Sequence, residues 1–127
     1  LISEYRTLHK KRVIEAVAGH VNEGENLLQT AKRELKEEIG FSGGEWRKLA
    51  QIEMAGSVIK SNMNLFMVKD FKIGKSNPEE GEDIIISKMS LGEAVQKVMT
   101  GEINIASAVI GILLLDQLRR EGKIWRF

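Results

Sequence analysis

The sequence has no cysteine, one proline and two histidines among its 127 residues. Without cysteine the chain can form no disulfide and offers no thiolate nucleophile. The same absence agrees with a reducing compartment, so we expect a cytoplasmic protein. His9 and His20 are too few for an ordinary zinc site. Neither shows a recognisable triad spacing with a serine, so covalent catalysis by a side chain has little support.

The sequence also lacks an excess of charge of either sign and a long apolar run. It has 19 Lys and Arg against 18 Asp and Glu, a net charge of +1. This balance argues against a nucleic-acid-binding groove. The most apolar stretch, residues 105–115, is about half the length that crosses a bilayer, and no signal peptide is visible. We therefore expect no nucleic-acid partner and no membrane association.

What the sequence does contain is a glycine-bearing loop that runs into an acidic helix. Residues 27–39 hold no Pro or Gly, and Gly40 is a helix stop signal, so we expect a helix over this range. At roughly 100° per residue, Glu34, Glu37 and Glu38 fall within an arc of about 100° on that helix. A separate apolar stripe lets the helix bury one side in a core, and it consists of Leu28, Ala31, Leu35 and Ile39.

Three carboxylates on one helix face repel one another, and protonation, a basic partner or a bound metal can relieve that repulsion. Oxygen ligands in small number suit Mg²⁺ or Mn²⁺, which fill their other positions with water and with phosphate oxygens of a substrate. Gly19 and Gly24 in the preceding loop let the backbone approach a ligand closely. These residues predict a divalent-metal site for a phosphorylated substrate. The alternative is a solvated helix face with ordinary Glu–Lys pairs.

The spacing of these residues resembles the signature of the Nudix hydrolases at every fixed position. The matching residues are Gly19, Glu25, Arg33-Glu34-Leu35, Glu37-Glu38 and Gly40-Phe41. The flanking segments are similar to the ADP-ribose pyrophosphatase branch of that family. They are Glu4-Tyr5-Arg6, residues 15–19, residues 22–25, residues 80–84, residues 90–94 and residues 101–106.

The resemblance implies a role for each matched position. Principal metal ligands would be Glu34 and Glu38, assisted by Glu37 and by the backbone carbonyl of Ala18. Arg33 would orient the acids by pairing with Glu25 or Glu37, while Glu25 and Gly19 would support the ligands from behind. Arg6 would contact the diphosphate and Glu15 would line the site. The base or water-orienting acid would be Glu80 or Glu82.

The implied reaction is attack of metal-activated water on a phosphorus of ADP-ribose, which releases AMP and ribose 5-phosphate. Two alternatives remain open. The chain could be a Nudix-fold module that binds a nucleotide without turnover. It could also hydrolyse another diphosphate, such as a nucleotide sugar or a dinucleoside polyphosphate, because specificity depends on loops rather than on the fold.

The resemblance and the hydrophobic pattern together predict an α/β/α sandwich with a mixed β-sheet in one domain, residues 1–127. Strands are expected at 1–5, 12–17, 46–53, 63–70 and 83–89, and helices at 27–39, 90–100 and 104–120. Loops are expected at Gly43-Gly44 and at 75–81. The sequence starts at Leu1, so we expect the family's N-terminal strands and dimerisation region to lie outside it; the family resemblance allows a homodimer.

Overall fold

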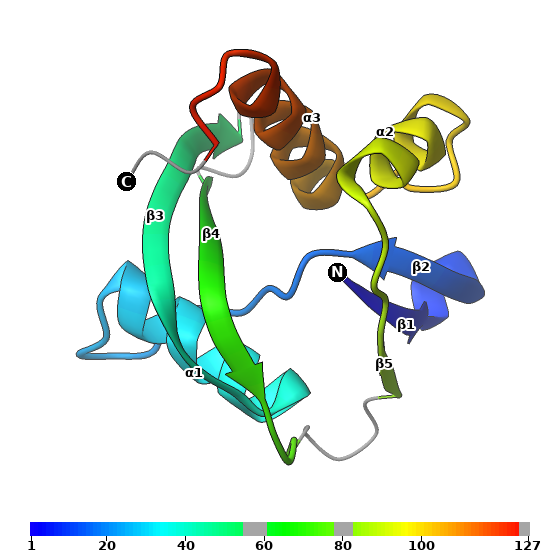
Figure 1. Cartoon of the computed structure of the whole chain (residues 1–127). Coiled ribbons are helices and arrows are strands. Elements are labelled where there is room, and N and C mark those ends of the chain that lie inside the picture. The colour runs from blue at the N-terminus through cyan, green and yellow to red at the C-terminus, as the bar shows by residue number, and fades with distance from the viewer. Residues whose placement is uncertain (55–60, 78–82, 125–127) are drawn as a thin grey trace.

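The computed structural model describes residues 1–54, 61–77 and 83–124, which form five strands and three α-helices (Figure 1). A single 3₁₀ turn at Thr7–His9 joins the first two strands. The elements in chain order are β1 (Ile2–Arg6), β2 (Lys11–Glu15), α1 (Leu27–Ile39), β3 (Phe41–Met54), β4 (Ser61–Ile73), β5 (Ile84–Ile86), α2 (Leu91–Met99) and α3 (Ala106–Arg120).

The first sheet has the order β2-β1-β5, and both of its pairings are antiparallel. Ile2 lies opposite Glu15 and Ile86, and Glu4 lies opposite Val13 and Ile84. Because side chains alternate along a strand, residues 2, 4 and 6 of β1 share one face of the sheet with Glu15. The sheet therefore places polar residues beside a fully buried Ile2, which is 2% exposed.

The second sheet is a long hairpin of β3 and β4. Gly43 and Gly44, expected in a loop, lie within β3 instead, so that strand begins five residues earlier than predicted. Their φ angles are 75° and 85°, and Asp70 on β4 has a φ of 54°. The pairing steps from Gly43↔Phe71 to Glu45↔Lys69. The two strands therefore stay paired on both sides of a short segment with left-handed backbone, a conformation that most residue types disfavour.

Helix α1 packs its apolar stripe between the two sheets. Ile39 is buried with Ile2 of β1 and Phe41 of β3, and Leu35, Trp46 and Val68 pack against them. Phe41 and Trp46 meet edge to face, with ring centroids 5.3 Å apart. The acidic helix is thereby anchored from both sides.

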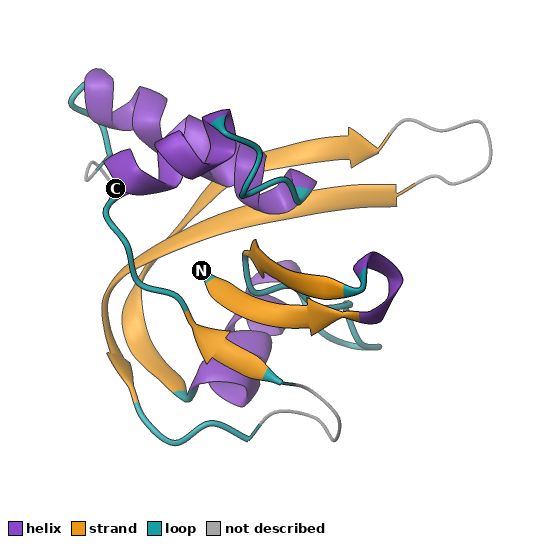
Figure 2. Cartoon of the chain, turned by 90° about the vertical axis from the view of Figure 1, so that its right-hand side faces the viewer, coloured by secondary structure: helices purple, strands orange, loops and turns teal. Residues whose placement is uncertain are grey.

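Helices α2 and α3 form a second apolar cluster, in which Ala94, Ile103, Ala108 and Ile112 are buried. Ile14 of β2 packs against that cluster. Figure 2 shows α2 and α3 on one side of the strands and α1 on the other. None of the described helices has the length and hydropathy of a membrane-spanning segment.

The α/β fold class is confirmed, and α1 has the predicted bounds. Among the described residues, however, all strand pairings are antiparallel and form two sheets, where one mixed sheet was expected. The strand β5 is also shorter than predicted, because after Ile86 the chain leaves β1 to enter α2. Chain order alone did not indicate that β3 and β4 would pair as a separate hairpin.

Gly40 is a position of this frame where neighbouring backbone leaves no room for a methyl group. It ends α1 with a φ of 66°, and an added Cβ would overlap the carbonyl of Gly74. We predict that Gly40→Ala lowers the free energy of unfolding by about 1–3 kcal/mol, measured by urea denaturation. The control Gly111→Ala, within α3 and with open space around it, should raise it by about 0.5–1 kcal/mol. An unchanged urea midpoint for Gly40→Ala would contradict the view that the left-handed backbone and the contact with Gly74 require glycine at this position.

Candidate functional site

Arg33 lies at the centre of a cluster of three carboxylates. Its Nε is 2.7 Å from Glu25 Oε1, and its Nη1 is 2.8 Å from Glu34 Oε1 and 3.2 Å from Glu37 Oε2. Its Nη2 donates to Glu25 Oε2 at 3.1 Å and to the carbonyl of His20 at 3.0 Å. One planar guanidinium therefore joins the loop before α1 to two acids of the helix. Arg33 was expected to pair with Glu25 or Glu37, and both pairings are present.

The electrostatics of this cluster favour its ionised form. The hydrogen bond from Arg33 is the largest cause that lowers the pKa of Glu25, to about 2, and bonds from the Asn22 backbone and the Thr30 hydroxyl assist. The hydrogen bond to Glu25 is also the largest of the causes that raise the pKa of Arg33. The bond from the Thr30 hydroxyl is shielded from water, because Thr30 is only 5% exposed. Glu25 is therefore a fixed anion on the loop, which holds Arg33 against the helix.

The loop meets the helix most closely at Gly19. A Cβ at this position would overlap the carboxyl group of Glu34. The side chain of Glu34 is 16% exposed, so it is held between the loop and Arg33. The absence of a side chain at Gly19 is therefore a steric requirement for the position of Glu34. This contact places the loop around Ala18 beside one of the predicted ligands.

Arg6 and Glu15, both predicted to contact or line a substrate site, are joined to each other. Arg6 Nε donates to Glu15 Oε1 at 2.7 Å, and Arg6 Nη2 lies 3.1 Å from Glu4 Oε2. The hydrogen bond to Glu15 is the largest cause that raises the pKa of Arg6, and the charge of Glu38 also contributes. Ile39, the neighbour of Glu38 on α1, is buried with Ile2 of β1, so this end of α1 lies beside the strand that carries Arg6. Glu15 and Glu38 are buried, at 5% and 9% exposure, whereas the Arg6 side chain is 43% exposed.

The donor set fits a hard divalent cation by its chemistry. Glu34, Glu37 and Glu38 supply only carboxylate oxygens from neighbouring positions of one helix, which is the ligand type of Mg²⁺ and Mn²⁺. Arg33 neutralises part of the charge of Glu34 and Glu37. Within the described ranges, no three acidic or histidine side chains already converge as a metal-binding group. The fit is one of donor chemistry and helix position.

Two predicted acids, Glu80 and Glu82, lie outside the described residues. The structure also adds residues that sequence reasoning missed. Asn26 caps α1 through a capping box with Gln29, a pattern visible in the sequence as Asn-x-x-Gln. Glu4 was missed as a partner of Arg6, although residues two positions apart on one strand point to the same face and could have indicated it.

Two curated relatives are similar over most of this chain. The ADP compounds hydrolase NudE of Escherichia coli (strain K12) is 26% identical over 125 residues, which cover 98% of this chain and 67% of NudE. The ADP-ribose pyrophosphatase of Mycobacterium tuberculosis (strain ATCC 25618 / H37Rv) is 27% identical over 116 residues, 89% of this chain and 56% of that protein. The chain thus spans between about half and two thirds of the length of these relatives.

A solved structure described as an ADP compounds hydrolase has a similar fold. It superposes with a TM-score of 0.83 at 26% sequence identity, and the match covers 96% of this chain and 66% of that chain. The family model described as the NUDIX domain matches residues 1–99. This match includes the loop, α1 and the Arg33 cluster. The chain therefore belongs to the NUDIX domain family.

Proposed function

We propose that this chain is a Mg²⁺-dependent hydrolase, with Mn²⁺ as an alternative cation, of a nucleoside diphosphate linked to another moiety. ADP-ribose, cleaved to AMP and ribose 5-phosphate, is the first substrate to test. The observation that carries the proposal is the Arg33 cluster, which fixes Glu34 and Glu37 against the Gly19 loop. The names of the two relatives, an ADP compounds hydrolase and an ADP-ribose pyrophosphatase, support the choice of substrate.

The residues that would hold the cation are Glu34, Glu37 and Glu38, with the carbonyl of Ala18. The chemistry that a divalent cation supplies in such a site is neutralisation of diphosphate charge and activation of a water molecule. In the proposed reaction a water molecule would add to one phosphorus and give its proton to the proposed base, and the bond from that phosphorus to the bridging oxygen would break. The bridging oxygen leaves with the second phosphate. No covalent bond to the protein is needed.

The protein's own contribution is positioning. Arg33 holds Glu34 and Glu37 at defined places by hydrogen bonds of 2.8 and 3.2 Å, so that less reorganisation is needed when substrate binds. The Arg6 side chain is paired with Glu15 and Glu4 on one side and is 43% exposed. We propose that its exposed part contacts the diphosphate. Glu80 or Glu82 remains the proposed base.

Three further features remain predictions from the sequence. They are the cytoplasmic location, the homodimer and the absence of a nucleic-acid or membrane partner. Binding without turnover is the alternative function, and a different diphosphate is the alternative substrate. A single assay series separates these readings when nucleotide binding and product release are both followed.

Glu38→Gln tests the proposed ligand because it keeps the shape of a 9% exposed side chain and removes its charge. We predict that Mg²⁺-dependent AMP release from ADP-ribose falls at least about 100-fold. Release is measured by chromatography, with nucleotide sugars and dinucleoside polyphosphates in parallel. The control is Glu102→Gln, the same change at an acid paired with Lys97 between α2 and α3, and it should keep full activity. Near-normal turnover of the Glu38→Gln variant would show that Glu38 is not a metal ligand. A wild-type protein that binds nucleotide without turnover would favour the alternative function, a binding module.

Gly19→Ala tests the contact between the loop and Glu34. The added methyl group would displace the Glu34 carboxyl group, and small displacements at a reacting centre reduce rates strongly. We predict a loss of turnover of about tenfold or more with little change in the urea midpoint, because only a side-chain end has to move. Gly92→Ala in α2, with open space around it, is the matched control. Equal activity of the two variants would show that Gly19 has no such role.

A further inference from the structure

A cavity of about 450 Å³ lies beside the acidic face of α1, between that helix and the chain that follows β4. Its lining is strongly cationic. The lining residues are Lys32, Arg33, Lys36, Glu37, Lys75 and Asn77. The proposed reaction assigns no role to the three lysines.

The cavity adjoins the proposed metal ligands because of the helix geometry. At roughly 100° per residue, Lys32 and Lys36 form one strip along α1, and Arg33 and Glu37 form the next. Glu34 and Glu38 follow on the far side of that second strip. Arg33 and Glu37 are therefore shared between the cavity and the acidic face. A ligand in the cavity would lie next to Glu37.

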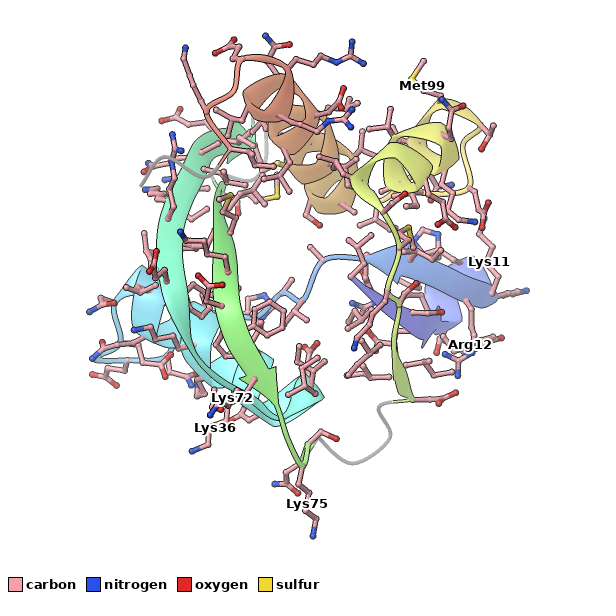
Figure 3. The ribbon with its side chains drawn as sticks, viewed as in Figure 1. Lys11, Arg12, Lys36, Lys72, Lys75 and Met99 are labelled. Atoms are coloured by element: carbon pink, nitrogen blue, oxygen red, sulfur yellow. The ribbon has the colours of Figure 1, made fainter. Side chains whose placement is uncertain are left out.

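The walls of the cavity are tied to α1 by defined contacts. The backbone N–H of Asn77 donates to the carbonyl of Glu37 at 2.8 Å, and that of Gly74 donates to the carbonyl of Gly40 at 2.8 Å. Lys32 Nζ lies 5.8 Å from the centroid of the Trp46 ring. Figure 3 shows Lys36 and Lys75 at the end of the molecule where α1 and β4 finish, and Lys11 on the hairpin of β1 and β2.

The charge of the cavity is not balanced by the acids that the structure describes. The positive charge of Arg33 is already matched by Glu25, Glu34 and Glu37. No carboxylate of the described ranges forms a salt bridge with any of the lining lysines, which are Lys32, Lys36 and Lys75. Lys32, Lys36 and Lys75 thus line an open space that is large enough for a tetrahedral anion, and their flexible side chains carry the charge that would attract one.

We propose that this cavity binds a phosphoryl dianion next to Glu37, through Lys36 and Lys75 with assistance from Lys32. The same chemistry has two sources: a phosphate of the substrate beyond the cleaved diphosphate, or free inorganic phosphate. The first source rests on the proposed function and would favour substrates with three or more phosphates. Binding of inorganic phosphate itself does not depend on hydrolysis.

The direct test is a titration of the metal-free protein with inorganic phosphate, followed by calorimetry. Without a divalent cation the acidic face repels phosphate, so any binding reports on the cationic lining of the cavity. We expect Lys36→Gln and Lys75→Gln each to weaken binding about 3- to 10-fold, and added salt to weaken it further by screening. Lys11→Gln is the matched control, because it removes the same charge on β2. No measurable binding, or equal losses in all three variants, would overturn the proposal.

Kinetics identify the source of the phosphate. If it belongs to the substrate, Lys36→Gln and Lys75→Gln raise KM for a dinucleoside triphosphate about 3- to 10-fold more than KM for ADP-ribose. If the ligand is free phosphate, the two KM values change alike, and phosphate changes the rate of the wild type more than that of the variants. A protein that binds phosphate but hydrolyses nothing would refute the proposed function and leave the cavity assignment intact. A wild type that hydrolyses its substrate but does not bind phosphate would refute the cavity assignment and leave the proposed function intact.

Discussion

The Arg33 guanidinium is the interaction on which the rest of the site depends. It bonds to acids of the loop and of α1 and to the carbonyl of His20. Without it, Glu34 and Glu37 would repel each other and the loop acid Glu25 at short range. A lysine could not satisfy this geometry, because only a planar fork of five N–H donors reaches several acceptors in fixed directions.

The arginine can serve this function because α1 is fixed along its apolar face and at both ends. Its apolar stripe is buried between Ile2 of the first sheet and Phe41 of the second. Its start is capped by Asn26, and its end is set by the left-handed Gly40, which also accepts a hydrogen bond from Gly74. The helix is therefore a rigid support for three neighbouring strips of side chains: the acids, Arg33 with Glu37, and the lysines. Function and packing use different faces of the same 13 residues.

The sequence predicted the parts of this structure that depend on local spacing. The bounds of α1 follow from the Gly40 stop signal and its acidic face from helix periodicity, and both are present. The pairing of Arg33, which the family resemblance implied, is present as well. Long-range geometry could not be predicted in the same way. The ion pair of Arg6 with Glu15 requires the register of β1 against β2, and the split into two sheets depends on how β3 and β4 pair. The lysine cavity requires the chain after β4 to return to α1, which no local pattern indicates.

The central claim is that the acids of α1 and the Gly19 loop together bind a divalent cation. The most direct measurement is a titration of the protein with MgCl₂, followed residue by residue through its backbone amide NMR signals. The account predicts the largest saturable shifts at Ala18, Gly19 and Glu34 to Glu38, with no comparable change in α2 or α3. Shifts centred on other residues, or no shifts at the Mg²⁺ concentrations used in the activity assay, would contradict the claim that these residues bind the cation.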